Sequence, residues 1–177
     1  MMPEFRPFPK IPRLYRECVI TEKIDGTNAQ IHITEPGEIF VGSRNGWITP
    51  EKDNFGFAAW VKDHHVELLT LGVGSHFGEW FGHKIQRGYG LTDRRFALFN
   101  TGKWNAENVP SCCCVVPVLY EGIFSDSEVT NALVRLQMSG SVLAPDYPNP
   151  EGIIIFHKAS GQLFKKTIEK DEEPKTK

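Results

Sequence analysis

The alternation of apolar and polar positions predicts a chain built mostly from short strands. From Cys18 to Thr34 the sequence is rich in β-forming residues and is interrupted by a glycine turn at Gly26, which predicts a strand, a sharp turn and a second strand. A Pro-Gly pair then predicts a hairpin onto a strand at 39–41. The Ser-Arg-Asn-Gly segment at 43–46 predicts a further turn.

Two segments have the apolar spacing of a helix face. Between Lys52 and Leu71 apolar residues recur at helical intervals, and Gly72 follows where a stop is expected, so we expect a helix packed on the sheet. The second helix begins at a capping box, Ser125 to Glu128. Further strands are expected at His76–Phe81, Arg95–Asn100, Val115–Tyr120, Gly152–His157 and Gln162–Thr167.

This order of elements predicts an α+β domain. Strands outnumber helices and most connections are short, so the sheets should be largely antiparallel with flanking helices, and the domain should span 18–167. Residues 1–17 are expected to form an arm, because their prolines cannot donate regular ladder hydrogen bonds. Residues 168–177 mix acidic and basic residues without an apolar face, which predicts a solvated tail.

Composition narrows the class of protein. The 177 residues are 40% hydrophobic, which suits one buried core, and the 20 basic residues nearly balance the 22 acidic ones, so any nucleic-acid contact must be a local patch. The four cysteines, Cys18 and 112–114, fit neither a disulfide framework nor a zinc site, and we expect reduced thiols in a cytoplasmic protein. Without an apolar run or a targeting signal, no membrane partner is expected.

The candidate chemistry gathers around one lysine. In a Glu-Lys-Ile-Asp-Gly-Thr-Asn segment, Lys23 ends a β-rich run directly before a glycine turn, which places its side chain at the rim of a sheet. Glu79 lies inside an aromatic strand and Glu151 stands directly ahead of an apolar one, and buried carboxylates need partners. The strand after the last hairpin supplies Lys165 and Lys166, close to Glu151 across an antiparallel pair.

In this order the segments resemble the covalent nucleotidyltransferase superfamily of polynucleotide ligases and mRNA capping enzymes. The family's landmarks match a nucleophile motif at 23–28, a central glutamate motif at 77–82, a metal-associated glutamate motif at 151–156 and a terminal lysine motif at 163–167. Arg44 lies in a turn where the family has an arginine, and Phe99 lies in a segment that resembles its purine-stacking strand. The resemblance implies an ATP-grasp-like nucleotidyltransferase domain of the ligase and capping-enzyme type.

Asn28 indicates the branch of that superfamily. DNA ligases and capping enzymes typically carry arginine at this position, two residues after the glycine, whereas RNA ligases of the second phage type carry asparagine. The resemblance therefore implies an ATP-dependent RNA ligase that transfers AMP to an RNA 5′-phosphate and seals it with a 3′-hydroxyl. Since the sequence ends about ten residues after its last motif, we expect a monomer without a C-terminal OB or other accessory domain, and an accessory protein is a candidate to replace that domain.

The resemblance also assigns roles. Lys23 is the expected nucleophile, Glu79 a ligand of the ribose hydroxyls, Phe99 a platform for the adenine, and Glu151 the ligand of Mg²⁺ or Mn²⁺. Arg44 is expected at the ribose or phosphate. The remaining expected contacts are Glu22, Lys165 and Lys166 with the nucleotide, Asn28 in the later steps, and Asp25, which also suits a brace of its own turn.

The reaction itself explains why cations should surround Lys23. The attacking amine has to be uncharged, although lysine is ordinarily charged near neutral pH. Lys165, Lys166, Arg44 and a bound divalent cation would favour the uncharged amine and also neutralise the α-phosphate. Positioning and charge stabilisation then supply most of the catalysis.

Several groups have simpler interpretations. A surface for RNA is expected from Lys10, Arg13, Arg16, Lys84, Arg87, Arg94 and Arg95, with an ordinary solvated charged face as the alternative. Trp60 and Trp80 are expected in the core, and the histidines lack metal-ligand spacing. The rival functions are a DNA ligase, a GTP-using capping-type enzyme, and an inactive nucleotide- or RNA-binding module. Asn28 argues against the first two, and the retained Lys23 argues against the third.

Overall fold

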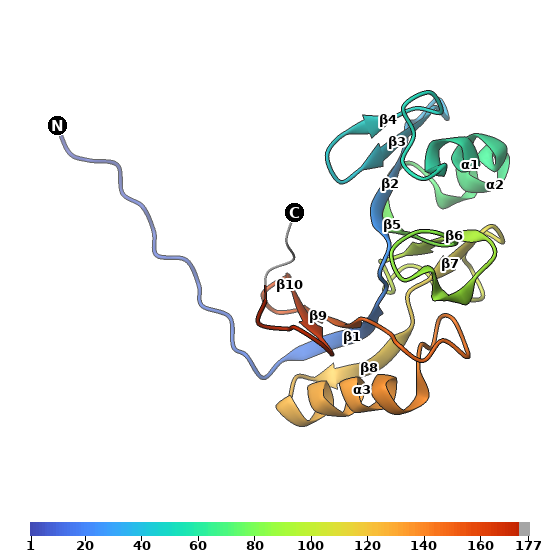
Figure 1. Ribbon diagram of the computed structural model, residues 1–177. Coiled ribbons are helices and arrows are strands. Elements are labelled where there is room, and N and C mark those ends of the chain that lie inside the picture. The colour runs from blue at the N-terminus through green and yellow to red at the C-terminus, as the bar shows by residue number, and fades with distance from the viewer. Residues whose placement is uncertain (174–177) are drawn as a thin grey trace.

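Two β-sheets form the body of the protein (Figure 1). The computed structural model describes residues 1–173. The smaller sheet contains β1 (Glu17–Lys23), β8 (Val118–Ile123), β9 (Gly152–His157) and β10 (Gln162–Thr167). The larger sheet contains β2 (Thr27–Ile33), β3 (Ile39–Ser43), β4 (Trp47–Ile48), β5 (Gly74–Gly82), β6 (Arg94–Leu98) and β7 (Cys113–Val115).

The strand order confirms an α+β fold with largely antiparallel sheets. The smaller sheet runs β10-β9-β1-β8 and the larger runs β4-β3-β2-β5-β6-β7. Among the described strands, the β6–β7 pair alone is parallel. The helices are α1 (Phe57–Asp63), α2 (His65–Leu68) and α3 (Asp126–Ser139), with 3₁₀ turns η1 (Leu69–Leu71) and η2 (Gly88–Gly90).

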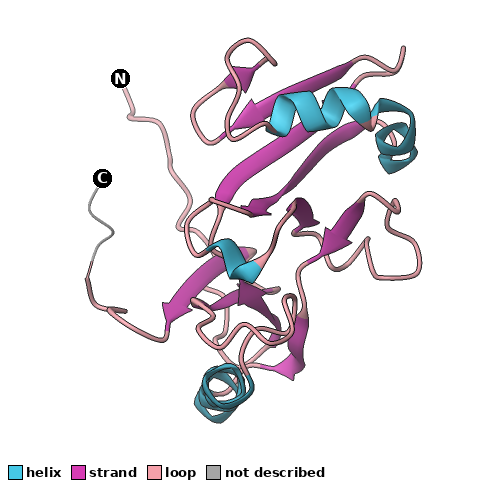
Figure 2. Ribbon diagram, turned by 45° about the vertical axis from the view of Figure 1, so that its right-hand side comes forward, coloured by secondary structure: helices cyan, strands magenta, loops and turns pink. Residues whose placement is uncertain are grey.

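Each sheet is covered by helices on one face (Figures 1 and 2). Side chains alternate across a strand, so Ala29, Ile31 and Ile33 of β2 point to the same side and pack with Phe57 and Val61 of α1. This core includes Trp80, with Trp60 packed against it, as the sequence predicted. In the smaller sheet the corresponding apolar residues pack against α3: Cys18, Ile20, Ile153 and Ile155 contact Val129, Ala132 and Leu136.

The predicted hairpins and the second helix are confirmed. β2 pairs with β3, β3 with β4, and β9 with β10, each in antiparallel register across a short turn. At the start of α3 the Ser125 hydroxyl accepts a hydrogen bond from the Glu128 backbone N–H at 3.2 Å, as a capping box requires.

The chain crosses between the two sheets at two places. β1 and β2 follow one another but pair in different sheets, joined by the segment 24–26. The prediction of one strand at Val115–Tyr120 is wrong in one respect. The segment is divided between β7 and β8, which belong to different sheets. The division falls at Pro117, which has no N–H to donate to a ladder. The two crossings bring the sheets together at the end of β1.

The helix expected between Lys52 and Leu71 begins later and is broken. Phe55 and Gly56 have positive φ values of 51° and 76°, and the Asp53 carboxylate accepts N–H bonds from the first turn of α1, so the helix starts at Phe57. At His64 the ring Nδ1 lies 2.9 Å from the Trp60 carbonyl oxygen and the backbone leaves helical geometry. The strand expected at Arg95–Asn100 likewise ends at Leu98.

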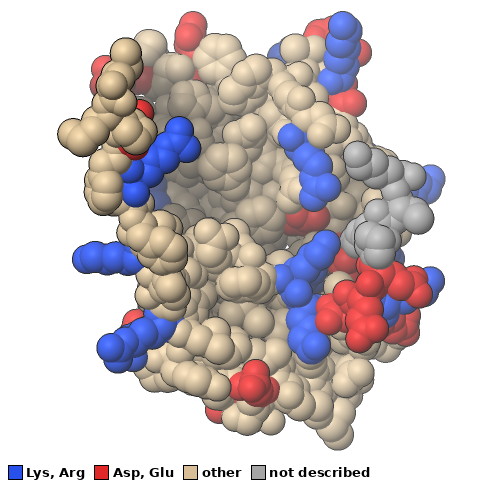
Figure 3. All heavy atoms as spheres, turned by 90° about the vertical axis from the view of Figure 1, so that its left-hand side faces the viewer, with Lys and Arg blue, Asp and Glu red and all other residues tan. Residues whose placement is uncertain are grey.

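The N-terminal arm lies outside this core. Residues 1–13 form no helix or strand and extend away from the sheets (Figure 1). Ile168 packs against the α3 side of the smaller sheet, and the rest of the expected tail lies partly outside the described residues. Within residues 1–173, none of the helices has the length and apolarity to span a membrane. Figure 3 shows a hollow that is lined mostly by uncharged residues, with basic side chains on either side of it and acidic atoms at one edge.

Candidate functional site

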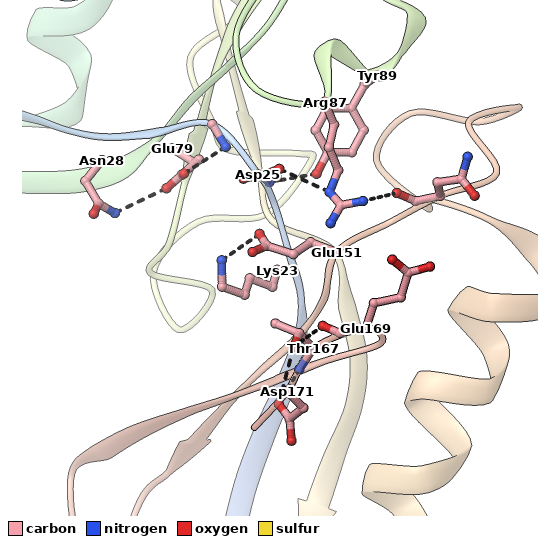
Figure 4. A network of polar contacts seen from close by, with 12 residues as sticks. Lys23, Asp25, Asn28, Glu79, Arg87, Tyr89, Glu151, Thr167, Glu169 and Asp171 are labelled. Carbon is pink, nitrogen blue, oxygen red and sulfur yellow. Dashed lines mark hydrogen bonds and ion pairs between the residues drawn. The ribbon is translucent and has the colours of Figure 1, made fainter. Parts of the chain in front are cut away.

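Lys23 and Glu151 form the centre of the site. Lys23 is the last residue of β1 and pairs with Gly152, the first residue of β9, so Glu151 lies directly beside the lysine. The Lys23 Nζ atom is 2.6 Å from Glu151 Oε2 (Figure 4). Glu151 is buried, with 3% of its side chain exposed, whereas 17% of the Lys23 side chain is exposed. The lysine side chain is therefore partly open to solvent, whereas its partner is closed off from it.

The charges around Lys23 differ from the expected cationic pocket. The Lys23 Nζ atom lies against the Glu151 carboxylate. The Lys166 ammonium lies 3.3 Å from Asp171 instead. The Arg44 Nε donates to the Asn28 side-chain oxygen at 3.0 Å. A carboxylate therefore lies closest to the Lys23 amine, while Lys166 and Arg44 contact other residues.

Strand register separates the two expected lysines of β10. Lys23, Gly152 and Thr167 lie opposite one another across β1, β9 and β10 and share a face of the sheet. Lys165, two residues before Thr167, shares that face because side chains alternate along a strand. Lys166 lies on the other face, opposite Ile153, whose side chain belongs to the core under α3. Lys165 is therefore the β10 cation on the side of Lys23.

Glu79 anchors a hydrogen-bonded network on the larger sheet. Its Oε1 accepts the Gly26 backbone N–H at 3.0 Å, and its Oε2 accepts the Asn28 side-chain amide at 3.2 Å (Figure 4). Since Arg44 donates to the Asn28 oxygen, the amide nitrogen of Asn28 has to face Glu79. Burial raises the pKa of Glu79 to about 7, against the opposing effects of the Gly26 N–H and of Lys23. The network ties the glycine turn to the site.

A second set of contacts holds the turn from its other side. Arg87 Nε lies 3.1 Å from the Asp25 carboxylate, and its Nη1 donates to the Asn149 carbonyl oxygen at 3.1 Å (Figure 4). The Asp25 backbone N–H donates to the Tyr89 hydroxyl at 2.7 Å. Asp25 was expected among the catalytic residues, with a brace of the turn through its own backbone as the alternative, and Arg87 was expected to face RNA. The structure instead pairs them across two loops, which fixes the segment that follows Lys23.

Glu22 does not share the position of its neighbour Lys23. Adjacent residues of a strand point to opposite faces, and the buried Glu22 carboxylate accepts hydrogen bonds from the Ser141 hydroxyl at 2.6 Å and from the Val142 and Leu143 N–H groups at 2.8 and 3.1 Å. These three donors occupy both oxygens. The expected direct contact of Glu22 with the nucleotide is therefore replaced by a role in holding the 141–143 loop.

The expected stacking residue lies on the open face of the larger sheet. Phe99 follows the end of β6, and its N–H donates to the Phe77 carbonyl oxygen at 3.0 Å. The strand register pairs Glu79 with Ala97, so Phe77 and Phe99 continue the same face as Glu79. The Phe99 side chain is exposed, which leaves its ring accessible to a base.

Some of the basic residues expected to face RNA contact other groups within the protein. Arg94 donates to the His83 and Phe55 carbonyl oxygens, and Arg95 pairs with Asp93. These contacts are within the protein, so Arg94 has a structural role. Arg16 donates to the Tyr15 carbonyl oxygen at 3.0 Å. Lys10 and Arg13 of the arm and Lys84 are exposed.

The site offers few protein ligands for a metal ion. Among residues 1–173 no three His, Cys, Asp or Glu side chains are grouped to hold a metal ion. A hard divalent cation such as Mg²⁺ nevertheless needs few protein ligands when it keeps water and takes phosphate oxygens. The Glu151 carboxylate beside Lys23 fits that requirement for a cation that arrives with a nucleotide.

These features define a class of protein. Two mostly antiparallel sheets meet at a lysine, with the Glu151 carboxylate beside it and Glu79 of the other sheet holding the turn that follows it, and they form the nucleotidyltransferase fold of ligases. The chain belongs to the RNA ligase family, whose model matches residues 16–167. The match covers all the described helices and strands and confirms the family that the motifs indicated.

Solved structures support the same fold. The chain is similar to Naegleria gruberi RNA ligase in an apo variant (TM-score 0.61, 18% identity, 86% of this chain and 49% of that one). Similar values hold for a variant with ATP and Mn (0.62, 18%, 87% and 50%) and for the ligase with PPi (0.59, 17%, 86% and 49%). The chain thus spans about half the length of these ligases. A comparison with curated proteins finds no match.

Proposed function

We propose that this protein is an ATP-dependent RNA ligase whose first step is the transfer of AMP to Lys23. The observation that carries the proposal is the convergence on the end of β1: the Lys23 amine lies beside Glu151, and the turn that follows it is held by Glu79. A binding module has no need for a solvent-reachable lysine at this point. Membership of the RNA ligase family supports the same reaction.

In the proposed step, the lysine nitrogen attacks the α-phosphorus of ATP. A nitrogen–phosphorus bond forms, the bond between the α-phosphorus and the bridging oxygen breaks, and pyrophosphate leaves with the electron pair. The amine loses its proton to solvent or to a carboxylate. In this proposal Glu79 accepts the ribose hydroxyls, Phe99 stacks on the adenine, and Lys165 offsets phosphate charge. Strand register supports it, because it puts Phe99 on the face of Glu79 and Lys165 on the face of Lys23.

A divalent cation completes the proposed site. When bound, Mg²⁺ or Mn²⁺ supplies charge that stabilises the reacting phosphate. Glu151 would hold it, and this would also end the pairing of Glu151 with Lys23. Among the structures similar to this chain, a variant of the Naegleria gruberi ligase is described with ATP and Mn.

The later steps concern RNA. An RNA 5′-phosphate would take the AMP from Lys23, and a 3′-hydroxyl would then displace AMP to form the phosphodiester. Asn28 lies between Arg44 and Glu79, a position from which its amide can contact the RNA end. Because the chain spans about half of the similar ligases, we include in the proposal a further protein or domain that supplies the remaining contacts.

Intact-protein mass spectrometry tests the first step. After incubation with ATP and Mg²⁺ or Mn²⁺, the protein should gain the mass of one AMP, and Lys23→Ala should not. Lys84→Ala is the matched control because it removes an exposed lysine outside the site. Competition between labelled ATP and GTP separates a ligase from a capping-type enzyme. Absence of any adduct across pH and metal conditions would contradict the proposal and favour a binding module.

A further inference from the structure

The larger sheet has an open face with exposed aromatic rings beyond the proposed nucleotide site. α1 and α2 cover one face of this sheet, and Glu79 lies on the other. On this open face the register aligns Trp47, Gly42, Gln30 and Phe77 in one row across β4, β3, β2 and β5. Phe77 adjoins Phe99 at the end of that row. The row therefore leads directly away from the expected adenine position.

A second row lies beside the first. Phe40 of β3 pairs with His32 of β2 and shares the open face, two residues from Gly42. The ring centroid of Trp47 lies 5.9 Å from that of Phe40 and 6.5 Å from that of His32. The exposed fractions are 46% for Phe40, 60% for Trp47 and 54% for Phe77. We refer to Phe40, Trp47 and Phe77 as the aromatic platform.

Polar groups for a nucleic acid lie along the platform. The Gln30 side chain covers Gly42, where an added Cβ would lie 2.7 Å from it, so an amide stands between the rings of the first row. On the other side of that row, Arg44 and Asn28 form the start of the Glu79 network. Stacking rings, an amide and a nearby guanidinium are the groups that recognise unpaired bases and the phosphates between them.

We propose that the aromatic platform binds unpaired RNA bases next to the end that is joined, which makes single-stranded RNA ends the substrate class. The inference rests on the proposed function for its RNA partner. Bases of an intact duplex are stacked on one another and hide their faces, whereas unpaired bases expose them to aromatic side chains. The platform adjoins the proposed nucleotide site on one open sheet face, so a strand bound there lies beside the reacting groups.

Binding of RNA to the full chain without ATP tests the platform directly. The probes are a 5′-phosphorylated, fluorescein-labelled single-stranded oligoribonucleotide, the same strand with abasic residues, and a nicked duplex, each followed by fluorescence anisotropy. Trp47→Ala and Phe40→Ala should each weaken binding of the single strand by about five-fold to a hundred-fold. Trp47→Phe retains a ring and should recover most of the affinity. Val66→Ala on α2, also an exposed apolar position, should have no effect.

The controls decide between the outcomes. The abasic strand should bind the native protein and Trp47→Ala equally, and Lys23 adenylylation should be unchanged in Trp47→Ala. Unchanged affinity for the single strand in both alanine variants would overturn the inference, as would an equal loss for the abasic strand or the nicked duplex. A change in oligomeric state on ultracentrifugation without loss of RNA affinity would assign the platform to a second copy instead. If the native protein forms no adduct but the alanine variants lose affinity for the strand, the proposed function fails and the platform stands.

Discussion

Lys23 and Glu151 are 128 positions apart in sequence, yet their side chains are in contact at 2.6 Å. The contact follows from the pairing of β1 with β9, which sets Lys23 opposite Gly152. The two residues of this ion pair are not equivalent, because Glu151 is buried and Lys23 is partly exposed. Loss of the lysine deprives a buried carboxylate of this partner, whereas loss of the carboxylate leaves an ammonium that water still reaches.

A double-mutant cycle measures this relationship. Lys23→Met should lower the free energy of unfolding by about 3 kcal/mol and Glu151→Gln by about 1–2 kcal/mol. The free energy of unfolding lost in the double variant should be smaller than the sum of the two single losses, by about 1 kcal/mol or more. Urea unfolding at neutral pH provides the measurement. Additive losses would show that the contact contributes nothing beyond the separate side chains.

Gly26 should be intolerant of any side chain. A Cβ at this position would lie 2.3 Å from the Trp80 carbonyl oxygen and 2.8 Å from the Phe81 Cβ atom, and neither can move without shifting β5. We expect Gly26→Ala to lower the free energy of unfolding by about 2–3 kcal/mol. Gly46→Ala is the control, since its Cβ would meet nothing within 4 Å, and it should change the free energy by less than about 0.5 kcal/mol.

The sequence predicts what local patterns determine. Alternation, turn residues and the capping box identify the hairpins and α3, and the order of motifs identifies the residues that meet around Lys23. Strand alternation also carries information about the site, because Lys165 and Lys166 have to point to opposite faces, as do Glu22 and Lys23. This rule puts Lys23 and Lys165 on the open side of the smaller sheet, and Glu22 and Lys166 on the side of α3.

Contacts between loops that are distant in the chain leave no comparable pattern in the sequence. The pairing of Arg87 with Asp25 depends on how the β5–β6 connection folds back over the β1–β2 turn. The available signal was a cluster of glycines between Gly82 and Gly90, where Lys84, Gln86 and Tyr89 also take positive φ values. Such backbone marks an unusual loop and does not indicate its partner. The division of one expected strand at Pro117 is also a matter of distant contacts, because β8 pairs with β1 in the other sheet.

Arg87 should act as a positioning residue for the Lys23 turn. Its guanidinium contacts Asp25 and the Asn149 carbonyl at once, which a lysine ammonium cannot reproduce in full. Under the proposed function, Arg87→Ala should slow formation of the AMP adduct by about ten- to a hundred-fold, and Arg87→Lys should recover part of the rate. Arg95→Ala, which removes an exposed pair with Asp93, is the control. Equal rates in all three variants would contradict this role.

Glu22 should be required for stability independently of any reaction. Glu22→Ala leaves the Ser141 hydroxyl and the Val142 and Leu143 N–H groups without their acceptors in a buried region. We expect the free energy of unfolding to fall by about 3–5 kcal/mol. Glu17→Ala, at the exposed start of the same strand, removes only a surface pair with Lys158 and should cost less than about 1 kcal/mol. Chemical denaturation of both variants decides the comparison.

The buried position of Glu79 predicts a pH-dependent stability. Burial raises the pKa of this carboxyl in the folded protein to about 7, above its ordinary value of 4.5, so the folded state binds the proton more tightly than the unfolded state does. The resulting stabilisation is complete below pH 4.5 and is lost as the pH rises through about 7. The free energy of unfolding of the native protein, minus that of Glu79→Gln, should therefore fall over this interval by on the order of 1–3 kcal/mol.

A surface carboxylate separates this effect from the general response to pH. Glu107 is exposed, and the corresponding difference for Glu107→Gln should stay flat across the same range. The direction of the slope is the decisive observation. If burial did not dominate, the Gly26 N–H and the Lys23 ammonium would hold the Glu79 carboxylate ionised, and the native protein would gain stability relative to Glu79→Gln as the pH rises. A rising difference in urea unfolding would therefore show that these two groups outweigh desolvation at Glu79.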